Sequence, residues 1–242
     1  MGKTQKISVF MTKQEQFYGF CYLAFQSLLL PSLLRAVLTI LYPDWNDAAL
    51  NLLYFAVNFA ASLFLFWHFL KGSLGFFTGN AWPCIWKAAV ALIVCKAAGA
   101  GLNALLQLGW PGYFMDTLLG PALRNPNDMQ IAQMVSKMPV LFTVATVLLV
   151  PATEELLHRG LIFGSLYRKS RAAAYAVSIF LFSAIHVIGY LHLADPVLFS
   201  LCFAQYLIPS LCLCFLYGNT GSVFAPILMH MAYNAVGILF VR

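Results

Sequence analysis

The stretch PVLFTVATVLLVPATEELLHRGLIFGSL, residues 139–166, decides how this chain folds. It is long enough to cross a bilayer, which takes about 20 mostly apolar residues. Yet Glu154, Glu155 and Arg159 lie within it. Each charge at the centre of a membrane helix costs about 2.5–3.5 kcal/mol on translocon scales, and such residues are functional by default. The stretch therefore predicts a membrane helix that carries a functional site.

The composition extends this interpretation to the whole chain. Of its 242 residues, 62% are hydrophobic and 9% are charged, whereas a soluble domain is about 25% charged. We therefore predict an all-α fold, a polytopic integral membrane helix bundle, with residues 1–242 as a single membrane domain. The net charge of +6 does not indicate nucleic acid binding, because basic residues gather at the ends of membrane spans.

The hydropathy pattern predicts about seven to eight transmembrane helices. The seven candidate segments are 17–41, 49–70, 84–106, 139–166, 172–193, 197–217 and 221–241. Between the third and fourth, residues 107–138 are expected to form an extramembrane loop with an interfacial helix. Lys3, Lys6 and Arg168 fall on one side of this arrangement, which predicts a cytoplasmic N-terminus. The short chain with few extensions favours the cytoplasmic (inner) membrane of a bacterium.

Two features within these segments are relevant to a site. Pro151 interrupts the fourth segment and predicts a new half-helix, with the two glutamates near its N-terminus, where the helix dipole favours negative charge. Lys96 lies deep in the third segment, and one interpretation is that it reaches a central cavity. Lys87, nine residues earlier, lies on the opposite face and is expected to reach toward the membrane surface.

Helix geometry separates the roles of the two glutamates. Residues four apart share a face, so Glu155 can pair with Arg159, and Glu154 with His158. The glutamates themselves are about 100° apart around the helix. We therefore expect Glu155 to hold Arg159 and Glu154 to point at a reacting water. The alternative is that Glu155 and Arg159 form only a structural ion pair.

Polar pairs in two later segments complete a candidate site. His186 lies in the fifth segment, and His230 and Asn234 lie one helical turn apart in the seventh. A histidine can polarise water, donate to an oxyanion or ligate a metal, and an asparagine can donate to an oxyanion. Taken singly, these residues could instead be hydrogen-bonding contacts between helices.

The ordered set of motifs resembles the CPBP family, the CAAX-protease and bacteriocin-processing proteins, also called Abi. The motifs are Glu-Glu-x-x-x-Arg at 154–159, Phe-x-x-x-His at 182–186 and His-x-x-x-Asn at 230–234. The resemblance covers 139–242, the expected catalytic core. It implies a catalytic set of Glu154, Glu155, Arg159, His186, His230 and Asn234, with Phe182 as a weaker candidate for substrate binding.

The family pattern also implies individual roles. Glu154 would be the base, assisted by His186, while His230 and Asn234 would stabilise the oxyanion. No cofactor is expected, although the sequence leaves a zinc enzyme open. In that case Glu154, His186 and His230 would be the ligands, with one coordination position left for water.

The resemblance predicts an intramembrane endopeptidase. Its substrates would be membrane-anchored peptides or proteins that reach the site through the lipid bilayer, such as lipidated tails and leader or sorting-signal peptides. One alternative is a membrane scaffold or regulator without proteolytic activity, of the bacteriocin-immunity or signalling type. A third interpretation is a small proton-coupled transporter that uses the Glu and His residues as a relay.

Overall fold

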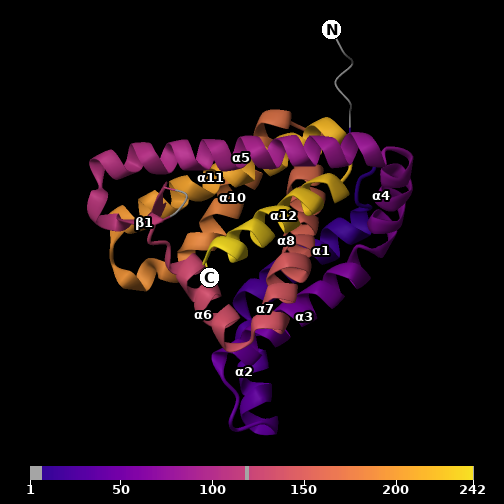
Figure 1. Ribbon diagram of the computed structural model, residues 1–242. Helices are drawn as coiled ribbons and strands as arrows, with labels where there is room; N and C mark the ends of the chain where they lie inside the picture. The colour runs from indigo at the N-terminus through magenta and orange to yellow at the C-terminus, as the bar shows by residue number, and fades with distance from the viewer. Residues whose placement is uncertain (1–6, 118–119, 242) are drawn as a thin grey trace.

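The computed structural model describes residues 7–117 and 120–241, and it is almost wholly helical (Figure 1). The N-terminal half contributes α1 (Lys13–Leu28), α2 (Leu30–Leu41), α3 (Asp47–Leu65), α4 (Trp67–Gly79) and α5 (Ala81–Gly109). The C-terminal half contributes α6 (Pro126–Lys137), α7 (Pro139–Val144), α8 (Val150–Glu155), α9 (Gly164–Tyr167), α10 (Arg171–Val187), α11 (Pro196–Thr220) and α12 (Phe224–Val241). Lys3 and Lys6, which support the predicted orientation, lie outside the described residues.

The predicted all-α membrane bundle is confirmed, with fewer full-length spans than expected. Within the described residues, five helices are long and apolar enough to cross a membrane: Asp47–Leu65, Ala81–Gly109, Pro139–Tyr167, Arg171–Leu193 and Pro196–Thr220. A sixth span results if α1 and α2 count as one, although they meet at a 56° bend. The predicted seventh segment is helical, but its apolar part, Phe224–Leu239, is shorter. By length and composition, the described residues therefore hold five or six candidate spans, against the seven to eight predicted.

The helix that carries the glutamates is continuous from Pro139 to Tyr167. It contains two π-helical segments, Ala145–Leu149 and Leu156–Phe163. The predicted half-helix beginning at Pro151 is therefore wrong. Proline removes one backbone donor, and the turn before it widens to the i→i+5 pattern instead of breaking. Consequently, the glutamates lie inside the helix rather than at an N-terminus.

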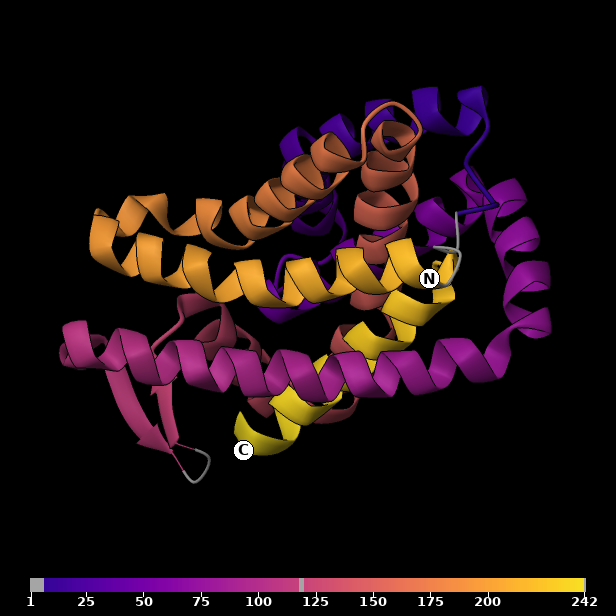
Figure 2. The ribbon, with the colours of Figure 1, turned by 90° about the horizontal axis from the view of Figure 1, so that it is seen from above.

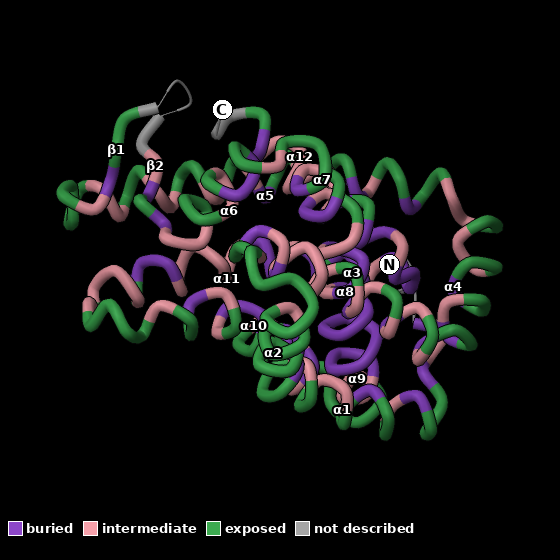
Figure 3. The backbone as a smooth tube through the Cα atoms, turned by 90° about the horizontal axis from the view of Figure 1, so that it is seen from below, coloured by how far each residue is buried: buried purple, intermediate pink, exposed green. Residues whose placement is uncertain are grey.

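This central helix is the most enclosed of the candidate spans. In its most apolar window 44% of residues are buried, against 6% for α5. Figure 3 shows the same contrast, with α8 mostly buried and much of α5 exposed. The enclosure keeps the charged residues of the central helix away from lipid. In helix bundles, intramembrane charges almost always face the interior of the bundle.

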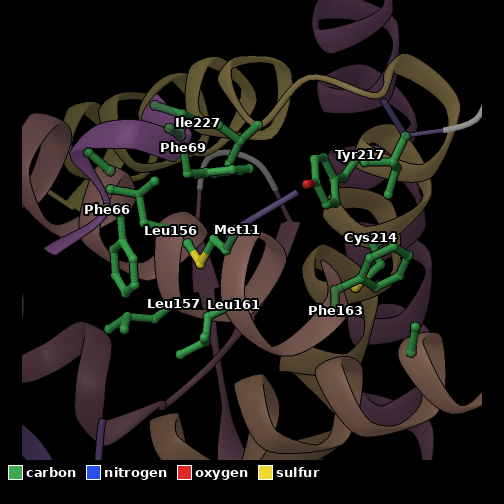
Figure 4. Packing of buried hydrophobic residues seen from close by; sticks show 14 residues of the cluster. Met11, Phe66, Phe69, Leu156, Leu157, Leu161, Phe163, Cys214, Tyr217 and Ile227 are labelled. Carbon is green, nitrogen blue, oxygen red and sulfur yellow. The ribbon is translucent and has the colours of Figure 1, made fainter. Parts of the chain in front are cut away.

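Close packing holds the central helix against the N-terminal helices. Leu156 and Leu161 are buried with Phe66 and Phe69 in one hydrophobic cluster (Figure 4). Gly160 permits this approach, because a Cβ atom there would lie 2.8 Å from the Met11 side chain and 3.1 Å from Phe69. The first half of the chain therefore fixes the position of the helix that bears the site.

The last three helices surround the other side of the central helix. Helices α10 and α11 lie side by side, and α5 runs along α11 and crosses α12 (Figure 2). Gly221 ends α11 at φ 71°, a left-handed conformation that glycine adopts without steric cost. The chain can therefore turn at once into α12, which carries His230 and Asn234.

Residues 107–138 hold a short antiparallel hairpin, β1 (Phe114–Thr117) and β2 (Gly120–Leu123), followed by α6. The start of α6 is tied to α11. The side-chain amide of Asn125 donates to Gln205 Oε1 at 2.8 Å and to the Tyr206 hydroxyl at 3.2 Å. Asn127 donates to the same hydroxyl at 3.0 Å. These bonds hold α6 beside the helices that carry the candidate site.

Candidate active site

The Glu155–Arg159 pair forms as the helical spacing predicts. Both side chains are fully buried, and Arg159 Nη1 donates to Glu155 Oε1 at 3.0 Å. Arg159 Nη2 also donates to the carbonyl and hydroxyl oxygens of Ser210, each at 3.2 Å. The guanidinium lies 4.4 Å from the centre of the Phe182 ring. The ion pair therefore joins the central helix to α10 and α11.

His230 lies between the two glutamates. Its Nδ1 is 2.8 Å from Glu155 Oε1, so this nitrogen carries the proton and donates to the carboxylate. Its Nε2 is 3.8 Å from Glu154 Oε2. A carboxylate on one ring nitrogen fixes both the orientation of a histidine and the nitrogen that faces the site.

His186 approaches Glu154 from α10 in a similar way. Its Nδ1 is 2.7 Å from the Phe182 carbonyl oxygen and must donate to it, and its Nε2 is 3.8 Å from Glu154 Oε2. Two ring nitrogens therefore face one carboxylate oxygen. The Glu154 side chain is 21% exposed, whereas that of Glu155 is fully buried, so only Glu154 is open to a reactant.

Asn234 has a backbone partner that follows from Pro151. In the π-helical turn the Val150 N–H bonds to the Ala145 carbonyl, and the next residue, Pro151, has no N–H. The Thr146 carbonyl is thereby left without a donor from its own helix. Asn234 Nδ2 donates to it at 2.9 Å. This bond orients Asn234 and leaves its second amide N–H free to face a ligand.

Phe182 acts as a shared packing surface for the histidines. Its ring centre lies 4.5 Å from that of His186, 5.9 Å from His230 and 5.2 Å from His158. The side chain is only 2% exposed. Its contacts are therefore mainly with the site residues, and its contribution is to hold their rings in place.

Two site residues on α11 were missed by sequence reasoning. Ser210 accepts from Arg159, and the Tyr206 ring lies 4.4 Å from the His186 ring at 31°. Their spacing of four residues places them on one face of a helix. That spacing could have indicated that both side chains face the site. The segment is so apolar, however, that the two residues do not form a recognisable polar motif.

The site opens into two adjoining cavities. The first, which we call the glutamate cavity, has a volume of about 380 Å³ and is lined by Glu154, Phe182, His186, His230 and Asn234, among others. The second, the lysine cavity, has a volume of about 440 Å³, and Lys96 and Ile238 contribute to its wall. Both cavities share Asp128, Tyr206, Tyr233 and Asn234 as lining residues.

Asp128 on α6 is the acidic residue shared by the two cavities. Its side chain is exposed to the cavities, yet the surrounding helices withdraw it from bulk water. This withdrawal raises the pKa of its carboxyl to about 6, while Lys96 and the Tyr206 hydroxyl act in the opposite direction. The Asp128 carboxyl on the shared wall therefore changes its charge just below neutral pH.

The fold defines an integral membrane protein whose central helix carries a buried polar cluster. Residues 136–236 match a family model described as type II CAAX prenyl endopeptidase Rce1-like. This segment therefore belongs to the CAAX protease, or CPBP, family, and the predicted resemblance is confirmed. The match contains all seven motif residues from Glu154 to Asn234. No curated protein and no solved structure matched the chain.

Proposed function

We propose that this protein is an intramembrane endopeptidase in which Glu154 activates the attacking water. One observation carries the proposal. Glu154 Oε2 has no hydrogen-bond partner among the described residues, and it lies 3.8 Å from the Nε2 atoms of both His186 and His230. A buried oxygen without a partner costs about 1–3 kcal/mol or more. A water molecule between these three atoms would remove that cost.

The tautomers support a defined orientation for such a water. Because His186 Nδ1 donates to a backbone carbonyl, its Nε2 accepts in the neutral ring. The water can then donate one hydrogen to Glu154 and the other to His186. Its oxygen lone pair is left to face a substrate carbonyl in the glutamate cavity, which is the geometry that general base catalysis needs.

The proposed reaction is hydrolysis of a peptide bond. Glu154 takes one proton from the water as the water oxygen bonds to the carbonyl carbon, and the carbonyl oxygen becomes an oxyanion. When the carbon–nitrogen bond breaks, the proton held by Glu154 passes to the leaving nitrogen. The carboxylic acid product gives its proton to the released amine, so the products are a carboxylate and an ammonium group, and the glutamate is ionised again.

His230 and Asn234 are proposed to stabilise the oxyanion. The Glu155 carboxylate holds Nδ1 of His230, so its Nε2 faces the glutamate cavity, where it donates to the oxyanion when it carries a proton. Asn234 contributes the amide hydrogen that is not bonded to Thr146. Preorganised donors of this kind are worth about 10²–10³ in kcat each.

The proposed mechanism needs no metal ion. The alternative uses Glu154, His186 and His230 as zinc ligands. At bond lengths of about 2.0–2.1 Å, the ligands of a tetrahedral zinc lie roughly 3.4 Å apart, whereas both histidine nitrogens lie 3.8 Å from the glutamate oxygen. The wider spacing favours water. Stoichiometric zinc in active protein, with activity lost on its removal and restored by zinc alone, would overturn the metal-free mechanism.

The proposed substrates are membrane-anchored, lipidated or leader and sorting-signal peptides. A site enclosed by membrane helices is accessible to chains that are already held in the bilayer. We further propose a location in a bacterial cytoplasmic membrane with a cytoplasmic N-terminus, in agreement with the basic residues near the span ends.

The first test compares the peptide termini in membranes of cells that carry wild-type protein or Glu154→Gln at equal abundance. Termini that appear only with wild type are expected, and they would identify the substrate. His186→Gln should behave as Glu154→Gln does, whereas His192→Gln, at an exposed histidine outside both cavities, should retain cleavage. Full cleavage by a stably folded Glu154→Gln protein would refute the proposed base.

A further inference from the structure

A third cavity adjoins Glu154 and has no part in the chemistry proposed above. We call it the side cavity, and its volume is about 100 Å³. It lies between α1, α3, α10 and the central helix. Its polar lining residues are Gln26, Tyr54, Asn58, Thr153, Glu154 and His158. A wall this polar between membrane helices indicates a polar ligand, because empty cavities in proteins are apolar.

Two buried polar atoms of this wall need a partner from outside the protein. Thr153 Oγ1 and His158 Nδ1 have no hydrogen-bond partner among the described residues. The two residues are only 6% and 2% exposed. Glu154 Oε2, on the same wall, is a third such atom. Buried polar atoms in native proteins are nearly always hydrogen-bonded, either to protein or to ordered water.

The opposite wall of the side cavity is already satisfied within the protein. The Tyr22 hydroxyl donates to Asn58 Oδ1 at 2.7 Å, and Asn58 Nδ2 donates to the Tyr54 carbonyl at 2.8 Å. The Tyr54 hydroxyl donates to the Gln26 carbonyl at 3.4 Å. These bonds fix the side chains of α1 and α3 in place. They leave Thr153 and His158 to be satisfied by a small molecule in the cavity.

We propose that the side cavity binds water at Thr153 and His158 and supplies it to Glu154. The use of this water rests on the proposed function, whereas its binding does not. The volume of about 100 Å³ is several times the roughly 10–15 Å³ that one water molecule needs. Water can both donate and accept, so it satisfies a hydroxyl and a ring nitrogen in either tautomer of His158.

A separate supply of water matters once a substrate is bound. Hydrolysis consumes one water molecule in each turnover, and a peptide that fills the glutamate cavity expels water from it. The side cavity meets the glutamate cavity at shared lining residues that include Glu154. Among the described lining residues of the side cavity, Glu154 is the only member of the catalytic set. Water can therefore reach Glu154 from the side cavity while the glutamate cavity is occupied.

Hydroxyl-radical footprinting tests the binding of water directly. Pulsed X-rays split water into radicals that oxidise the side chains beside it, and mass spectrometry locates the oxidised residues. In wild-type protein in nanodiscs, we expect His158 to be oxidised several times faster than Tyr217. Tyr217 is equally buried, has a hydroxyl without a partner among the described residues, and lines none of the three cavities. Oxidation of His158 no faster than that of Tyr217 would overturn the proposal.

Kinetics test the supply of water, with the peptide that wild type cleaves in the comparison of termini. Thr153→Val keeps the shape of the side chain and removes its hydroxyl. It should lower kcat about fivefold, the factor that one neutral hydrogen bond typically contributes. KM should not change, because the peptide occupies a different cavity. Thr153→Ser retains the hydroxyl and should keep the wild-type kcat.

Thr143→Val is the matched control. Thr143 lies on the same helix and also has a buried hydroxyl without a partner among the described residues, but it lines none of the three cavities. It should leave kcat unchanged. His158→Phe keeps a ring against Phe182 and should lower kcat as Thr153→Val does. Equal kcat values for Thr153→Val and Thr143→Val, or a change confined to KM, would overturn the supply role.

Failure of this proposal is distinguishable from failure of the proposed function. Oxidation of His158 together with no cleavage by wild type would refute the peptidase, and with it the supply role, while the binding of water would stand. Cleavage by wild type without oxidation of His158 would refute the hydrated side cavity alone.

Discussion

Replacement of Glu155 by alanine should destabilise the fold far more than the same change at its neighbour Glu154. Glu155 is fully buried, and its Oε1 accepts from both Arg159 and His230. Without it, the Arg159 guanidinium is buried with no counter-charge. Removal of one partner of a buried ion pair costs about 3–5 kcal/mol.

Two features of the structure change this cost in opposite directions. Arg159 would keep its hydrogen bonds to Ser210, and these bonds reduce the loss of stability. His230 would lose the acceptor that orients its ring, and a hydrogen bond to a charged group is worth about 1.5–3 kcal/mol. We therefore place the net effect of Glu155→Ala at about 3–5 kcal/mol. Glu154 is partly exposed and has no ion pair with Arg159. Glu154→Ala should therefore lower the free energy of unfolding by less than about 1 kcal/mol.

Equilibrium unfolding in mixed micelles, followed by circular dichroism, measures both values. A double-mutant cycle with Arg159→Met isolates the ion pair, because the single change at Glu155 leaves a buried charge and the double change does not. The double variant should therefore be more stable than Glu155→Ala alone. Equal unfolding free energies for Glu154→Ala and Glu155→Ala would refute the division of roles between the two glutamates.

Two further predictions concern the central helix. Asn234→Ala should lower the free energy of unfolding by about 1–3 kcal/mol, because the Thr146 carbonyl loses its donor. Pro151→Ala should reduce that loss, because alanine supplies a backbone N–H. Additive changes in unfolding free energy for the two substitutions would contradict the explanation. Gly160→Ala should destabilise by about 1–3 kcal/mol through overpacking; its melting temperature should recover in part when Met11 is also replaced by alanine, and a Gly160→Ala protein as stable as wild type would show that the contact is not tight.

Local spacing was sufficient to predict the ion pair of the site. The separation of Glu155 and Arg159 by four residues places both on one face of any helix, and the structure has them in contact. The three motifs also indicated that His186 and His230 meet the glutamates, and the structure brings both histidines to 3.8 Å from Glu154. Charged and polar side chains in apolar helices tend to face one another, because lipid offers them no partner.

The backbone of the central helix was not predictable in the same way. A proline in an apolar segment is compatible with a break, a kink or a π-helical turn. The choice here depends on Asn234, which lies 88 residues from Thr146 and satisfies its carbonyl. A donor from another helix satisfies the carbonyl that the proline leaves unpaired, so the helix can continue without a break. Nothing in the local sequence around Pro151 identifies that donor.

The lysine cavity depended on contacts between distant segments as well. The sequence placed Lys96 deep in a span and allowed it to reach a cavity, but it did not identify Tyr233 or Asp128 as neighbours. Residues 107–138 were expected to include a helix, and α6 does form there. The sequence did not predict where this helix lies. In the structure, the hydrogen bonds from Asn125 and Asn127 to α11 hold it against both cavities.

The helices that line the two cavities are buried to different extents, and this difference fits the proposed role of Glu154. The proton transfers from water to Glu154 and onward require positions fixed within about 0.5 Å. The central helix can provide this, because it is the most buried of the candidate spans and two helices hold its histidine partners. Lys96, on the wall of the lysine cavity, is instead carried by α5, which is only 6% buried in its most apolar window, and it lies outside the segment that matches the family.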